Sequence, residues 1–178
     1  IEYAKKGLEY SNEDYALYYI LGTACMASKK FEESVEYIEH AIKLNPDNVQ
    51  LYNNLGTSYL TIGELDKAFE TYERASKVDP KDSLTYFNMA SILQLQNKHK
   101  EACEYFAKAH ELEPEEDSYL VAWALSEVKA GQFKEAIEHY KYLASAYPQK
   151  SSYRYNLACC YQVVGEYEVA ITLLKQLA

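Results

Sequence analysis

The stretch "KVDPKDSLTYFNMA", residues 77–90, places a proline at residue 80 in a chain whose remaining composition favours helices. Proline lacks a backbone N–H and disfavours the helical conformation in the residue before it, so a helix ends close to this point. The chain has four prolines, and each lies 34 residues after the one before: Pro46, Pro80, Pro114 and Pro148. A fixed interval between helix breakers predicts an internal repeat of 34 residues.

Setting the prolines in register divides the chain into five blocks. The predicted repeats span residues 15–48, 49–82, 83–116, 117–150 and 151–178, and the last is cut short. Within each block, positions 4, 7, 8 and 11 share one helical face, and positions 17, 20, 21, 24 and 27 share another. Position 15 is Gly in three blocks and Lys29 or Asn97 in the other two, which predicts a turn between two helices. We expect the small residue at position 8 to face the small residue at position 20, and polar residues such as Asn48, Asp82 and Asp117 to cap the next helix.

The second block resembles the tetratricopeptide repeat family, through the residues Tyr52-x-x-Leu55-Gly56-x-x-Tyr59, Ala68-x-x-x-Tyr72 and Pro80. The resemblance covers nearly the whole chain, because residues 1–14 also fit the second helix of a preceding repeat. It implies an all-α fold, namely a right-handed superhelical solenoid of antiparallel helix hairpins that forms one continuous domain. Arg154 at position 4 and Glu127 at position 11 depart from the pattern, so we expect their repeats to be looser or specialised. No polar cap is visible at either end, which suggests a longer array and self-association through uncapped repeat ends.

Composition argues against several classes of function. The net charge of −9 disfavours nucleic-acid binding, which needs clustered Lys and Arg, and no apolar run is long enough for membrane insertion. None of the four cysteines forms a Cys-x-x-Cys pair, which is typical of a reduced protein and predicts a cytoplasmic location. Glu135 and His139 are four residues apart and are interpreted as solvated helix neighbours. We therefore expect no catalytic residue, no metal site and no cofactor.

The distribution of charge is the strongest indication of function. Positions 1–14 of the five blocks hold 5 × 14 = 70 residues, and only Asp117, Glu127, Lys129 and Arg154 among them are charged. The other 41 of the 18 + 27 = 45 charged residues lie elsewhere in the chain. A helix without charge on any face is not a solvated surface helix. Because the family resemblance implies that first helices line the concave side of the stack, the sequence predicts a neutral or apolar groove.

Asparagines and aromatic residues are the main candidates for contacts in this groove. An amide can bond both the N–H and the C=O of an extended peptide, and aromatic rings supply apolar anchoring area. The candidate partner-binding residues are Tyr19, Thr23, Asn53, Asn54, Thr57, Phe87, Asn88, Ser91, Lys129, Tyr155 and Asn156. The alternative is that each asparagine bonds a neighbouring helix or water. Some domains of this family clamp a carboxylate with Lys or Arg at positions 5 and 9, and no such cations occur here.

The sequence thus predicts a non-enzymatic protein–protein interaction module with a scaffold or adaptor role. Its groove would bind an extended peptide or a helix of neutral or apolar character. Two alternatives remain open: a structural spacer in a larger complex, and the substrate- or partner-recruiting arm of a multidomain enzyme.

Overall fold

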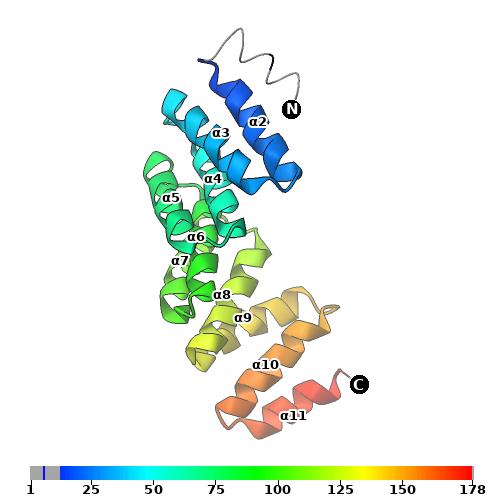
Figure 1. Cartoon of the computed structure of the whole chain (residues 1–178). Helices are drawn as coiled ribbons and strands as arrows, with labels where there is room; N and C mark the ends of the chain where they lie inside the picture. The colour runs from blue at the N-terminus through cyan, green and yellow to red at the C-terminus, as the bar shows by residue number, and fades with distance from the viewer. Residues whose placement is uncertain (1–5, 7–12, 178) are drawn as a thin grey trace. The chain divides into compact units, whose positions relative to one another are not determined.

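The computed structural model describes residue 6 and residues 13–177, so the expectation that residues 1–14 form the second helix of a preceding repeat falls almost entirely outside the described part. The described residues form ten helices and no strand (Figure 1). The first helices of the five blocks are α2 (Tyr15–Ala27), α4 (Val49–Thr61), α6 (Ser83–Leu95), α8 (Asp117–Ala130) and α10 (Ser151–Val163). The second helices are α3 (Phe31–Leu44), α5 (Leu65–Val78), α7 (His99–Leu112), α9 (Phe133–Ala146) and α11 (Tyr167–Lys175).

The turn inside each hairpin is left-handed at position 15 of the block, as the breaker residues predict. The φ angles at these positions are +59° at Lys29, +87° at Gly63, +60° at Asn97, +77° at Gly131 and +89° at Gly165. The next N–H returns to the carbonyl five residues earlier, for example from Glu64 to Tyr59 at 2.9 Å. This pairing satisfies carbonyl groups that the end of a helix leaves free, and it fixes the reversal of the chain.

Polar side chains cap the helices that follow the prolines. Asn48 accepts a hydrogen bond from the N–H of Gln50 at 3.1 Å, and Asp82 accepts one from the N–H of Thr85 at 3.1 Å, as expected. Before α8 the cap is Glu116, which accepts from the N–H of Ser118 at 3.2 Å. Asp117 is not this cap, because it is already the first residue of the helix.

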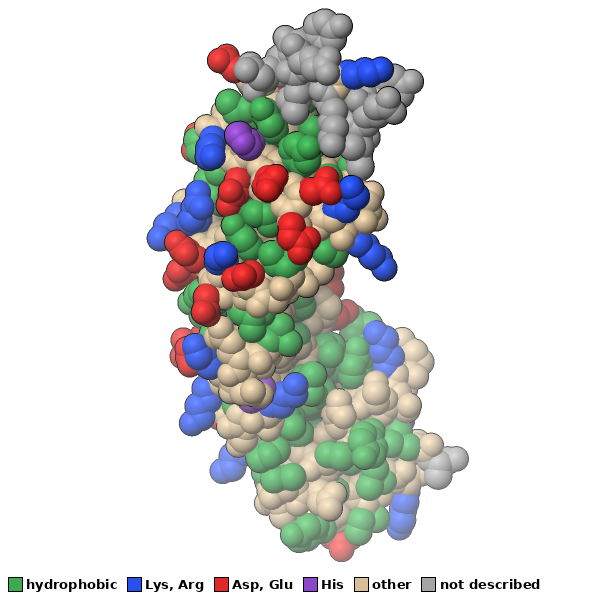
Figure 2. All heavy atoms as spheres, in the orientation of Figure 1, with side chains coloured by type: hydrophobic (Ala, Val, Ile, Leu, Met, Phe, Trp, Pro, Cys, Tyr) green, Lys and Arg blue, Asp and Glu red, His purple; other side chains and the backbone are tan. Residues whose placement is uncertain are grey.

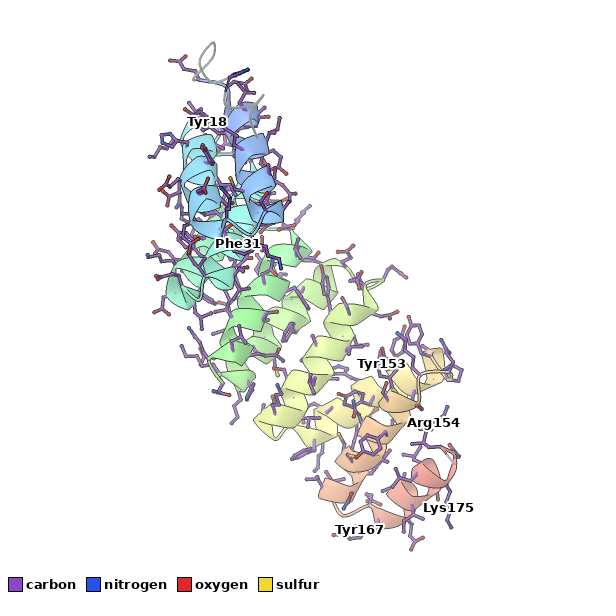
Figure 3. All side chains as sticks on the ribbon, turned by 45° about the vertical axis from the view of Figure 1, so that its right-hand side comes forward. Tyr18, Phe31, Tyr153, Arg154, Tyr167 and Lys175 are labelled. Carbon is purple, nitrogen blue, oxygen red and sulfur yellow. The ribbon has the colours of Figure 1, made fainter. Side chains whose placement is uncertain are left out.

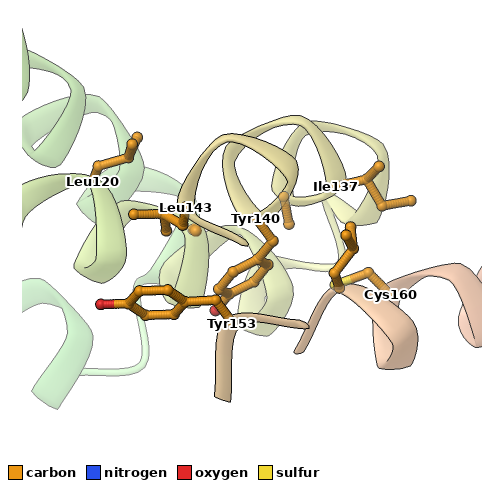
Figure 4. Packing of buried hydrophobic residues seen from close by; sticks show 9 residues of the cluster. Leu120, Ile137, Tyr140, Leu143, Tyr153 and Cys160 are labelled. Carbon is orange, nitrogen blue, oxygen red and sulfur yellow. The ribbon is translucent and has the colours of Figure 1, made fainter. Parts of the chain in front are cut away.

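The chain divides into two compact units, residues 1–92 and residues 93–178. In the first unit α2 packs on α3, α3 on α4 and α4 on α5, around a core that includes Ile38, Leu51 and Leu55. In the second unit each helix from α7 to α11 packs on the next, and Leu120, Tyr140, Leu143, Tyr153 and Cys160 belong to its core (Figure 4). The prediction of an all-α stack of antiparallel helix hairpins is confirmed. That the five blocks act as one continuous domain stays a prediction.

The small residues at position 8 leave room for a large side chain of the second helix. A Cβ built on Gly22 would lie 2.5 Å from Cγ1 of Ile38, and one built on Gly56 would lie 2.6 Å from the Tyr72 ring. Position 8 therefore accommodates the large side chain of position 24 in these two repeats, and the expectation that it faces position 20 stays a prediction. In the first repeat position 20 also contacts the next repeat, since Ser34 Oγ lies 3.2 Å from Ser58 Oγ.

Candidate functional site

Eight of the predicted partner-binding residues lie in the first unit, on the first helices α2, α4 and α6. Asn53 is buried, and the other seven are half-buried: Tyr19, Thr23, Asn54, Thr57, Phe87, Asn88 and Ser91. The surface around them differs from the rest of the unit, because these first helices carry no charged residue. Figure 2 shows one face of the molecule, on which Asp and Glu side chains gather together with Lys and Arg over the first unit.

Asn54 and Asn88 occupy the same position in consecutive repeats. Both side chains are half-buried, and neither amide has a hydrogen-bond partner among the described residues. Each amide has two N–H donors and an acceptor oxygen available for an external group. This arrangement is suited to binding a peptide backbone, and contact with a peptide stays a prediction.

Asn53 occupies a different environment although it is adjacent to Asn54. Its side-chain Nδ2 donates to the carboxylate of Asp82 at 2.8 Å, and its Oδ1 accepts from the Thr85 hydroxyl at 2.9 Å. The residue is only 4% exposed. Asn53 therefore joins α4 to the first turn of α6, which corresponds to the alternative of a bond to a neighbouring helix.

The predicted hydroxyl groups donate their protons within the chain. Thr23 donates to the carbonyl of Tyr19 at 3.0 Å, and Ser91 donates to the carbonyl of Phe87 at 2.8 Å. Thr57 Oγ1 lies 2.8 Å from the carbonyl of Asn53 and 3.0 Å from the hydroxyl of Tyr72. Burial raises the pKa of Tyr72 to about 12, so its phenol is neutral at pH 7. These side chains therefore offer acceptor oxygens and apolar surface to a partner, and no free positive or negative charge.

The other three predicted residues lie in the second unit. Lys129 and Tyr155 are exposed, and Tyr155 retains 54% of its accessible surface. Asn156 lines a cavity of about 120 Å³ formed by α8, α9 and α10. The lining is mainly apolar and includes Leu125, Val128, Phe133, Tyr140, Cys159 and Val163. Burial raises the pKa of Tyr140 to about 12, while the hydrogen bond from the Asn156 side chain acts in the opposite direction.

Sequence reasoning named Asn156 but missed the cavity around it. A signal was present, since Leu125, Val128 and Cys159 are apolar residues of the first helices, which were predicted to line the groove. Hydrophobic side chains are also exposed over α10 and α11 in Figure 2.

The cysteine chemistry does not indicate a nucleophile. All four cysteines are free thiols, and burial raises the pKa of both Cys103 and Cys160 to about 11. A thiol with such a pKa is almost fully protonated at pH 7, and the thiolate is the reactive form. Within the described ranges, no group of three or more His, Cys, Asp and Glu residues could hold a metal ion. None of the helices described is both long and apolar enough to cross a bilayer.

The two residues that depart from the repeat pattern have specific partners. Arg154, in the first turn of α10 (Figure 3), donates to the carbonyl of Pro148 at 3.0 Å. From the equivalent position of the third repeat, Tyr86 donates to the carbonyl of Pro80 at 3.2 Å. Glu127 is 3% exposed, and its Oε2 lies 2.8 Å from Nδ1 of His139. The interpretation of His139 as a solvated neighbour of Glu135 is therefore wrong, because its hydrogen-bond partner Glu127 is on the preceding helix.

Comparison with known families agrees with this architecture. The family model described as tetratricopeptide repeat matches residues 13–81, and the model described as anaphase-promoting complex, cyclosome, subunit 3 matches residues 63–141 and again residues 95–177. The chain belongs to the tetratricopeptide repeat family. The two matches to the subunit-3 model begin at residues 63 and 95, about one repeat apart. The model therefore matches the repeated unit of this chain in two successive registers. No curated protein matches the sequence.

Solved structures of other tetratricopeptide repeat proteins have the same fold. YrrB, whose structure is described as "a TPR protein with an unusual peptide-binding site", is 18% identical, and the match covers 97% of this chain and 89% of YrrB with a TM-score of 0.83. A MamA protein is 20% identical, over 91% of this chain and 88% of MamA, with a TM-score of 0.82. MamA from Desulfovibrio magneticus RS-1 is 14% identical, over 91% of this chain and 92% of that one, with a TM-score of 0.80. At these low sequence identities, the comparisons show similarity of fold alone.

Proposed function

We propose that this chain is a non-enzymatic interaction module that binds an extended, neutral or apolar peptide segment on its first helices. The observation that carries the proposal is the pair Asn54 and Asn88, which are half-buried on an uncharged surface and have no intrachain hydrogen-bond partner among the described residues. Two amides in equivalent positions of neighbouring repeats can hold a backbone without reading its side chains. The peptide-binding site named for YrrB is consistent with this role for the fold.

The remaining candidates have separate roles in the proposal. Tyr19 and Phe87 supply apolar contact area in the first unit, and Thr23, Thr57 and Ser91 supply acceptor oxygens. In the second unit, Tyr155 and the cavity beside Asn156 accept apolar side chains, and Lys129 adds an exposed cation. Asn53 holds α4 and α6 in place, so its contribution to binding is indirect. A cytoplasmic location and self-association through the repeat ends also remain proposals.

The test uses peptides selected for binding to the chain itself. A library of random dodecapeptides on phage is selected against the immobilised chain, and fluorescein-labelled synthetic copies are then titrated with purified variants by fluorescence anisotropy. The variant Asn54→Ala/Asn88→Ala should lose affinity by roughly tenfold or more, since each amide contributes about 1 kcal/mol per hydrogen bond. A matched control is Glu70→Ala/Lys77→Ala, which changes two exposed residues of α5 and leaves the net charge unchanged.

Equal affinity of the double asparagine variant and the control would contradict the proposal. That result would favour the alternatives of a spacer or a recruiting arm, because neither needs free amides on the first helices.

A further inference from the structure

A second cavity lies in the second unit, between α7, α8 and α9. Its volume is about 510 Å³, which lies in the range of small-ligand sites. The residues that matter for its chemistry are Lys100, Glu104, Trp123, Glu127, Gln132 and Glu135. Two of them come from the first helix α8, and the others lie on or beside the second helices α7 and α9.

The cavity gathers both large departures of its repeat from the pattern of the array. Trp123 stands at position 7, where the other blocks have Leu or Met, and Glu127 stands at position 11, where they have Cys, Tyr, Leu and Tyr. Stacking of the hairpins does not require either change, because the other repeats stack with apolar residues at position 7 and uncharged residues at position 11. Their presence in one cavity indicates a requirement other than the fold.

One buried acceptor of the cavity lacks a hydrogen-bond donor, and a largely buried carboxylate lies in the same lining. Glu127 is 3% exposed, and its Oε2 atom lies 2.8 Å from Nδ1 of His139. The side-chain Oε1 of Gln132 is buried and has no hydrogen-bond partner. Glu104 and Glu135 add two exposed carboxylates, against the single cation Lys100. A buried acceptor without a donor is costly, and a ligand that brings several N–H groups could bond Gln132 Oε1 and the carboxylates together.

The aromatic ring and the spread of carboxylates define the ligand further. These three carboxylates do not form a group that could hold a metal ion, so a larger organic cation suits them better. The ring of Trp123 has His139 beside it, at 4.3 Å between ring centroids, and the indole also lines the cavity. A guanidinium group is planar, stacks on indole, and has five donors that reach carboxylates in pairs.

We propose that this cavity binds an arginine side chain of a protein partner. The guanidinium lies against Trp123 and donates to the carboxylate of Glu127 and the amide oxygen of Gln132. Glu104 and Glu135 add long-range attraction from the rim. This site is independent of the peptide-binding proposal for the first helices, because it uses other residues and other chemistry.

Trp123 is the only tryptophan of the chain, so its fluorescence reports on this cavity directly. The probe is the tripeptide acetyl-Gly-Arg-Gly-amide, titrated into the 178-residue chain at pH 7.5 while indole emission is recorded. The control tripeptides carry citrulline, which is neutral and nearly isosteric, or lysine. We expect a saturable change with arginine that weakens as salt rises, no saturable change with citrulline, and weaker binding of lysine.

Substitutions identify the groups responsible. Glu127→Gln should weaken binding of the arginine peptide roughly tenfold or more, because a charge-assisted hydrogen bond is lost. Glu104→Gln/Glu135→Gln tests the rim without altering a buried residue, and should reduce both the affinity and its salt dependence. Glu101→Gln is the matched control, since it removes one exposed charge from α7 outside the cavity.

Thermal melts by circular dichroism show whether each variant is folded. If Glu127→Gln does not fold, the rim variant decides the test. The proposal is overturned by equal responses to arginine and citrulline, by lysine binding as tightly as arginine, or by rim and control variants that bind alike.

Discussion

Lys29 has a backbone conformation that is unfavourable for its residue type. It lies at φ +59° in the turn between α2 and α3, where three of the five repeats have glycine. The left-handed conformation brings Cβ close to the following carbonyl oxygen and costs roughly 1–2 kcal/mol for an L-residue with a Cβ. Glycine avoids this contact, although it loses more conformational freedom on folding.

Replacing Lys29 by glycine should therefore stabilise the chain. We expect Lys29→Gly to raise the free energy of unfolding by roughly 0.5–1 kcal/mol, measured by urea denaturation followed by circular dichroism. Asn97→Gly is the matched comparison, because Asn97 lies at φ +60° but asparagine tolerates this conformation better. A gain at residue 97 as large as the gain at residue 29 would contradict the argument.

At the scale of the element, adjacent asparagines of α4 have opposite roles. Asn53 bonds Asp82 and Thr85 at the start of α6, whereas the Asn54 amide has no partner among the described residues. Asp82 also caps α6 through the N–H of Thr85. Of these two asparagines, only Asn53 connects α4 to the next repeat through its side chain.

This difference can be measured. Asn53→Ala should lower the free energy of unfolding by roughly 1.5–3 kcal/mol, because a hydrogen bond to a carboxylate is lost and a buried cavity is left. Asn54→Ala should change it by less than about 0.5 kcal/mol, as at other surface positions without specific contacts. Urea denaturation of both variants provides the comparison, and a larger effect at Asn54 would contradict the assignment of roles.

The same pair of residues shows how far the sequence determines the site. Period and breaker residues predicted the helix pairs and all five turns, because these depend on local conformational preferences. Periodicity also placed Asn53 and Asn54 on the groove side of one helix, but it could not tell which was buried. That depends on Asp82, 29 residues away, which becomes a neighbour only when the repeats stack. Glu127 was likewise recognised from the sequence as a departure from the repeat pattern. Its contact with His139 could not be predicted, because it forms only when α8 packs against α9.

At the scale of the molecule, a stack of hairpins distributes stability unevenly. Each helix contacts mainly the helices before and after it in sequence. How easily a helix opens locally therefore depends on how many apolar side chains it buries. In the second unit, α9 buries Ala136, Ile137, Tyr140 and Leu143, whereas α11 buries only Ala170. Several apolar side chains of α11 are instead exposed, including Tyr167 at 62% and Ile171 at 45%.

We therefore expect α11 to open without the rest of the second unit. In hydrogen exchange of the 178-residue chain monitored by mass spectrometry, peptides from α11 should lose protection at a free energy well below that of peptides from α9. Adding urea below the unfolding midpoint should leave exchange in α11 nearly unchanged while exchange in α9 accelerates, because small openings expose little new surface. Equal protection and an equal urea response in both helices would show instead that the second unit opens as one cooperative body, in which case the exposed side chains of α11 would not mark a weak element of the fold.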